Sequence, residues 1–171
     1  MFHIIEDAIR STNEYAEIHK ILCREYGRTT LATDNDPYTN PRAAIFDFFI
    51  KSKDYEHCLD IIEVSFQIIY SHEDDVGGLY GSPRAAQNYD SAVEELNGRF
   101  QEAGIGYQFE ENQLVKIDSK VIHSEVVKPV IRLLGKSKQY RGANSEFLKA
   151  HEHYRHKRYT DCINECNKSF E

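Results

Sequence analysis

Apolar residues recur at helical spacing along the first part of the chain. Three stripes predict helices over about residues 13–26, from Pro41 to about 50, and over 55–70. Gly27 can end the first helix because glycine readily adopts the left-handed conformation of a helix C-cap. Thr39 or Asn40 is the expected cap of the second helix. We therefore expect packed helices, with polar loops between them.

A fourth helix is predicted from about Tyr89, with Gly104 as its stop, and a change of pattern follows it. Residues 107–117 alternate between apolar and polar, which is typical of strands. Glu111 and Asn112 interrupt the alternation, and Asn112 can adopt the positive φ of a two-residue turn. The sequence predicts one short β-hairpin near 106–118.

Helical spacing returns from Ser119 to Leu134, with Pro129 inside it. Because proline lacks an N–H group, it should kink the helix near Lys128 or mark a break between two helices. Residues 135–144 read as a connection, after which Asn144 or Ser145 caps a further helix.

Residues 156–158 then turn the chain into a last helix, so the chain ends in an αα-hairpin. The expected fold is mainly α. Its expected domains are 1–138, a helical domain with the hairpin, and 139–171, an incomplete helical hairpin.

The last helix carries an apolar stripe that no stop signal and no further helix follows. We interpret the stripe as half of an interface for self-association or a protein partner, and the chain as a fragment of a longer protein. The predicted interface residues are Tyr159, Cys162, Ile163, Cys166 and Phe170.

Composition favours a folded protein in a reducing compartment. Hydrophobic residues make up 40% of the chain and aromatic residues 12%, which is enough for a core. No apolar run approaches the roughly 18 to 20 residues of a membrane span. The N-terminal MFHIIEDAIR has acidic residues where a signal peptide has basic ones. The four cysteines lie in helical patterns, as small buried hydrophobes do, so we expect a cytoplasmic protein without membrane contact.

Charge is distributed unevenly along the chain. The formal net charge is −7, but residues 128–158 hold nine basic residues against two acidic ones, so this segment carries +7 and the remainder −14. Such polarity can steer a nucleic acid, or can join oppositely charged parts of one protein or of two protomers. The candidate contact residues for RNA or a partner are Arg132, Lys136, Lys138, Arg141, Arg155, Lys157 and Arg158.

The sequence holds no decisive catalytic motif. HEHYRH contains His151 and His153, but two residues apart on a helix point about 200° away from each other. Cys162 and Cys166 share the apolar stripe, so buried packing explains them better than zinc does. The acidic run at 72–75 is read as a solvated loop, although its carboxylates also suit a divalent cation. Phosphate-loop, G-x-S-x-G and H-E-x-x-H motifs are missing, so we expect no cofactor, no metal and no catalytic residue.

The segments FFIKSKDYEHCLDIIEVSF, GIGYQFEENQLVKIDSKVIHSEVVKPVIRLL and YRGANSEFLKAHEHYRHKRYTDCINECNKSFE resemble bacterial abortive-infection proteins. In these proteins an AbiJ-type N-terminal domain precedes a HEPN-like helical domain. The resemblance implies that the chain from Asn144 onward opens the HEPN-like part. HEPN ribonucleases use an R-x4-6-H motif, and no arginine here precedes a histidine at that spacing.

Three functions follow as expectations. The first is a non-catalytic regulatory or interaction module of an antiphage abortive-infection protein, acting through association. The second is an RNA-binding or RNase effector of the HEPN type, whose active motif lies outside this chain. The third is an adaptor of the tetratricopeptide type, because Ala150, Tyr159 and Cys162 fit small and aromatic positions of one such unit.

Overall fold

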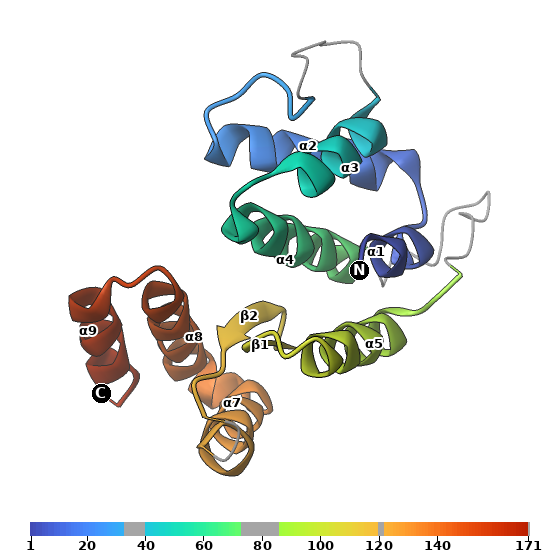
Figure 1. Cartoon of the computed structure of the whole chain (residues 1–171). Coiled ribbons are helices and arrows are strands. Elements are labelled where there is room, and N and C mark those ends of the chain that lie inside the picture. The colour runs from blue at the N-terminus through green and yellow to red at the C-terminus, as the bar shows by residue number, and fades with distance from the viewer. Residues whose placement is uncertain (33–39, 73–85, 120–121, 171) are drawn as a thin grey trace. The chain divides into compact units, whose positions relative to one another are not determined.

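The computed structural model describes residues 1–32, 40–72, 86–119 and 122–170. The chain divides into two compact units, 1–96 and 97–171. The predicted domain boundary between 138 and 139 lies inside the second unit and stays a prediction. The mainly helical fold with one hairpin is confirmed (Figure 1).

Helices build the first unit. They are α1 (Phe2–Ala8), α2 (Thr12–Glu25), α3 (Pro41–Lys51), α4 (Tyr55–Ser71) and the first part of α5 (Tyr89–Glu102). The predicted bounds of α2, α3 and α4 hold to within about one residue. Gly27 has a φ of 61° and ends α2 as expected. The side chain of Asn40 caps α3, since its Oδ1 accepts a hydrogen bond from the Arg42 N–H at 2.9 Å, and Thr39 lies outside the described residues.

The core of this unit follows the predicted stripes in part. Ile18, Leu22 and Phe66 of these stripes are fully buried, and so are Ile5, Leu31, Ile45 and Ile61, which lie outside the predicted stripes.

The helix α1 was not predicted. Phe2 packs its ring against those of Phe46 and Phe49, at centroid distances of 5.0 and 5.7 Å, while Ile4 and Ile5 are buried. A seven-residue helix has too few turns to show a period, and its stability comes from these distant contacts.

The second unit opens with the predicted hairpin. Strands β1 (Tyr107–Glu110) and β2 (Gln113–Lys116) pair antiparallel, with Phe109 opposite Leu114. Glu111 and Asn112 both have positive φ, 46° and 67°, as the mirror-image turns of tight hairpins require. The turn therefore lies where the sequence placed it.

Pro129 is accommodated without a break in the helix. A π-helical turn, η1 (His123–Val127), runs directly into α7 (Lys128–Gly135), which has Pro129 in its first turn. Within η1 the N–H of Lys128 donates to the carbonyl of His123, five residues back. Wider π turns inside helices absorb such local irregularities.

The chain ends in the predicted αα-hairpin. A 3-10 turn, η2 (Lys138–Tyr140), leads into α8 (Arg141–Arg155), and α9 (Tyr159–Ser169) packs against α8. The predicted cap at Asn144 or Ser145 is wrong. The helix starts earlier because η2 already turns the chain, with Ser137 Oγ accepting from the Gln139 N–H at 3.3 Å.

Candidate functional site

The structure divides the predicted interface stripe of α9 into two sets. Tyr159, Ile163 and Phe170 are 55%, 61% and 86% exposed, whereas Cys162 and Cys166 are half-buried and line a cavity beside α8. Burial of apolar area stabilises the packing of helices, so three large exposed side chains, two on α9 and one directly after it, leave a surface suited to a partner. We call Tyr159, Ile163 and Phe170 the α9 face.

The candidate basic residues fall at both ends of α8. Arg132, Lys136, Lys138 and Arg141 are exposed and follow one another through α7, η2 and the start of α8. Lys157 lies beyond the far end of α8, about 24 Å away along a helix that rises 1.5 Å per residue. The seven residues therefore do not form one surface.

Two of the candidate basic residues are engaged within the fold. Arg155 is only 4% exposed, so its guanidinium does not belong to an accessible basic surface. Arg158 lies 3.5 Å from the carboxylate of Glu152. Lys157 and Arg158 remain exposed at the far end of α8, so the larger accessible basic group is the one that precedes and opens α8.

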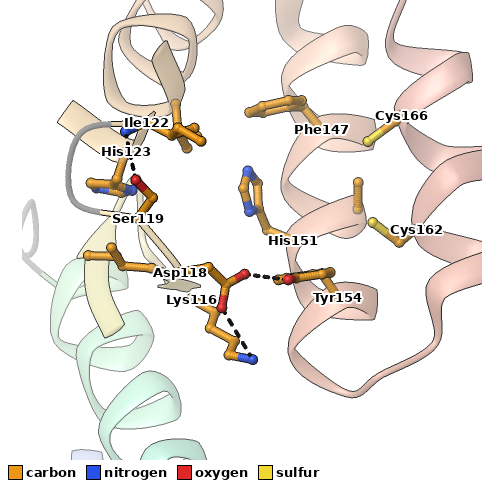
Figure 2. A pocket seen from close by; sticks show the side chains of 13 residues that line it. Lys116, Asp118, Ser119, Ile122, His123, Phe147, His151, Tyr154, Cys162 and Cys166 are labelled. Carbon is orange, nitrogen blue, oxygen red and sulfur yellow. Dashed lines mark hydrogen bonds and ion pairs between the residues drawn. The ribbon is translucent and has the colours of Figure 1, made fainter. Parts of the chain in front are cut away.

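A cavity of about 270 Å³ lies inside the second unit, between the end of β2 with η1 and the α8–α9 hairpin (Figure 2). Its walls are mostly apolar, with two histidines and two thiols among them. The lining residues of the described chain are Lys116, Ile117, Asp118, Ser119, Ile122, His123, Val127, Phe147, Ala150, His151, Tyr154, Cys162 and Cys166.

Figure 2 shows His151 projecting from α8 toward the side of the cavity that carries His123. Burial lowers the pKa of His151 to about 4, and the neighbouring His123 adds to that shift. Burial also lowers the pKa of His123, which is 5% exposed. Both imidazoles are therefore uncharged at neutral pH, and each offers one donor and one acceptor.

A polar group stands at one side of the cavity. The Tyr154 hydroxyl donates to the Asp118 carboxylate, and Lys116 Nζ lies 3.5 Å from the same carboxylate and 5.3 Å from the centre of the Tyr154 ring. The hydrogen bond to Asp118 raises the pKa of Tyr154, so the phenol stays protonated. These contacts join the end of β2 to α8 and neutralise Lys116.

The Cys162 thiol beside the cavity is uncharged. Burial raises the pKa of Cys162, and the nearby Cys166 raises it further, so this thiol is protonated at neutral pH. Of the two histidines in HEHYRH that spacing placed on different faces, His151 lines this cavity and His153 lines another, with Asp161 and Asn164. Within the described ranges, no three His, Cys, Asp or Glu side chains are grouped to hold a metal ion. Residues 73–75 of the acidic run lie outside the described residues.

Sequence reasoning missed His123 as a site residue. It stands 28 positions before His151, and no spacing rule connects them. Only the fold of the second unit brings both residues to the lining of one cavity.

The profile of the AbiJ N-terminal domain 4 family matches residues 1–131. The chain belongs to this family. A HEPN-like domain profile matches residues 141–171, which hold α8 and α9. Together these matches confirm the resemblance and indicate an abortive-infection defence protein. The cavity takes lining residues from both matched segments.

No curated protein and no solved structure matches the chain. Among the described residues, no helix combines the length and apolarity needed to cross a membrane.

Proposed function

We propose that the chain is a non-catalytic regulatory and interaction module of a cytoplasmic abortive-infection protein, and that it acts by self-association through the α9 face. One observation carries this proposal: three large apolar side chains are exposed on α9 and at its C-cap, within the HEPN-like segment. A partner protein on the same face would serve the same role.

The size of the α9 face sets the expected strength of association. Burying a fully exposed large apolar side chain is worth roughly 1.5 to 3 kcal/mol. Because these three are 55%, 61% and 86% exposed, covering the α9 face of one protomer contributes roughly 3 to 6 kcal/mol. Association costs an estimated 4 kcal/mol or more in lost freedom of motion. The α9 face alone therefore supports weak, concentration-dependent association, and neighbouring surface must contribute for a tight complex.

Sedimentation velocity over a wide concentration range tests this proposal. The wild-type chain should shift from monomer toward a larger species as concentration rises. Ile163→Glu combined with Phe170→Glu should remove the shift, because a carboxylate at each position cannot be buried without a large desolvation cost.

Ile50→Glu is the matched control. Ile50 on α3 is 61% exposed, the same fraction as Ile163, but lies in the first unit. It should leave association unchanged. A wild-type chain that stays monomeric throughout, or an association that the α9 variant leaves intact, would contradict the proposal.

RNA binding is a second candidate, supported by the exposed basic group at the start of α8. Arg132, Lys136, Lys138 and Arg141 occur in a stretch, 128–145, that holds no carboxylate. Tyr140 within it is 43% exposed and offers an aromatic face for stacking. Basic side chains that have no neighbouring carboxylates are available to contact the phosphates of RNA.

Measuring the affinity for a single-stranded RNA at several salt concentrations tests this second function. Replacing Lys136 and Lys138 with Gln should reduce the slope of log affinity against log salt by about 1.4, since each single-strand phosphate contact contributes about 0.7. Lys20→Gln with Lys53→Gln, exposed in the first unit, removes the same charge as a control. Equal slopes for the two double variants would exclude the basic group as an RNA surface.

A further inference from the structure

The helical segment formed by η1 and α7 exposes a strip of large aliphatic side chains. Ile122, Val126 and Leu133 are 58%, 54% and 64% exposed. Their spacing of four and then seven residues is that of one face of a helix, and His123 and Ile131 are buried on the other side. Val126 and Leu133 line neither of the two cavities described above. We call Ile122, Val126 and Leu133 the η1–α7 strip.

Four exposed basic side chains lie on α7 or follow it closely. They are Arg132, Lys136, Lys138 and Arg141. None of the four forms an ion pair with a described residue. From residue 122 to residue 145 the sequence holds a single carboxylate, that of Glu125. The η1–α7 strip is therefore next to an excess of positive charge that the described part of the chain does not balance.

The combination of aliphatic and basic side chains limits what can cover this surface. RNA offers phosphates to the cations, but its bases stack on aromatic side chains and gain little from aliphatic ones. A membrane of anionic phospholipids suits both kinds of side chain, because its headgroups attract Lys and Arg while apolar side chains of the same helix enter the acyl boundary. Tyr140, which is 43% exposed, adds a ring with an apolar body and a polar tip, as membrane interfaces favour.

We propose that the η1–α7 strip and its four basic neighbours bind the surface of an anionic phospholipid membrane, with η1 and α7 lying along the interface. Such peripheral contact needs no helix that crosses the bilayer. It replaces the expectation of no membrane contact, which rested on the lack of a spanning segment. Anionic lipids face the cytoplasm, so the contact agrees with a cytoplasmic protein. The strip is distinct from the α9 face, and this inference does not depend on self-association.

A tryptophan reporter tests the contact directly. The chain contains no tryptophan, so Leu133→Trp places a single indole at an exposed position of the strip. Its fluorescence should shift to shorter wavelength on addition of vesicles of equal parts phosphatidylglycerol and phosphatidylcholine, because the indole leaves water. Ile50→Trp is the matched control, since Ile50 on α3 is 61% exposed, and it should not shift. Vesicles of phosphatidylcholine alone should shift neither variant.

Vesicle co-sedimentation measures the apolar and the electrostatic part of the contact separately. Leu133→Gln should weaken binding to the phosphatidylglycerol vesicles about tenfold, since it removes the apolar area of one largely exposed side chain. Lys136→Gln combined with Lys138→Gln should weaken it about 25-fold, since each basic residue near an anionic surface strengthens binding about fivefold. All three positions are exposed, so these variants should keep the wild-type fold, which circular dichroism checks.

Matched controls for co-sedimentation lie in the first unit. Ile50→Gln removes an aliphatic side chain of similar exposure, and Lys20→Gln with Lys53→Gln removes the same charge. Both should bind vesicles as the wild-type chain does.

The same variants separate a membrane from RNA. Leu133→Gln removes no charge, so it should leave the affinity for single-stranded RNA unchanged. Vesicle binding that Leu133→Gln leaves intact, equal binding to phosphatidylcholine alone, equal losses in the controls, or no shift of the Leu133→Trp fluorescence would each overturn the proposal. RNA binding without vesicle binding would assign the surface to RNA and overturn it as well.

Discussion

His151 makes the stability of the second unit depend on pH. Its pKa is about 4 in the folded protein and about 6.5 in an unfolded chain. As pH falls below 6.5 the unfolded chain takes up the proton first, so stability is lost progressively down to about pH 4. The loss is at most about 3 kcal/mol, and His123, whose pKa is also lowered, acts in the same direction. Of the other cavity residues, Lys116 and Asp118 carry charge.

Urea unfolding at neutral pH and at about pH 5 measures this dependence. His151→Gln, which does not titrate, should flatten the decrease in the free energy of unfolding. His156→Gln serves as an exposed control and should retain the wild-type decrease. If the His151 variant loses as much stability on acidification as the wild-type chain, the neutral buried imidazole is not the source.

At the scale of residues, the sequence identified which residues belong to the apolar stripe and the basic segment, but not which of their side chains the fold buries. Helical spacing identified the α9 stripe, yet it could not show that Cys162 and Cys166 face the cavity while Ile163 faces solvent. Charge counting likewise included Arg155, which the fold buries. Which side of a helix is covered depends on packing against segments distant in sequence.

At the scale of elements, Asn97 fixes the hairpin to α5. Its Nδ2 donates to the Phe109 carbonyl at 2.9 Å, and its Oδ1 accepts from the Phe109 N–H at 2.7 Å. Phe109 is buried, so these bonds satisfy main-chain groups of β1 away from water. A two-stranded hairpin is marginal alone, and this pair of bonds helps to hold it.

Asn97→Ala should lower the free energy of unfolding by about 1 to 3 kcal/mol, because both bonds are lost and buried main-chain groups are left without that partner. Chemical denaturation followed by circular dichroism measures the change. Asn164→Ala, exposed on α9, should alter stability by about 0.5 kcal/mol or less. Similar stabilities for the two variants would contradict this role of Asn97.

Elements with a long, regular pattern could be predicted from sequence. The helix α4 carries several turns of apolar stripe and an Asp54 cap, and the hairpin has clear alternation and a turn residue at Asn112. The exceptions were α1, the π turn before Pro129 and the start of α8. Each is a short or irregular feature that distant packing or a preceding turn decides.

At the scale of the whole molecule, the α9 face lies in the segment that the HEPN-like profile matches. The chain belongs to the AbiJ N-terminal domain 4 family and continues into a HEPN-like segment, in which Tyr159 and Ile163 of α9 and Phe170 directly after it are exposed. Composition and charge alone could indicate a folded acidic protein with a basic stretch. They could not locate the apolar surface, because exposure depends on the fold.

Hydrogen–deuterium exchange at low and high protein concentration shows whether the α9 face is covered in solution. Amides of α9 (Tyr159–Ser169) should exchange more slowly at high concentration, while those of α4 in the first unit should be unchanged. The Ile163→Glu, Phe170→Glu variant should lose this protection. Exchange of α9 that is independent of concentration, or protection that appears only elsewhere, would contradict association through the α9 face.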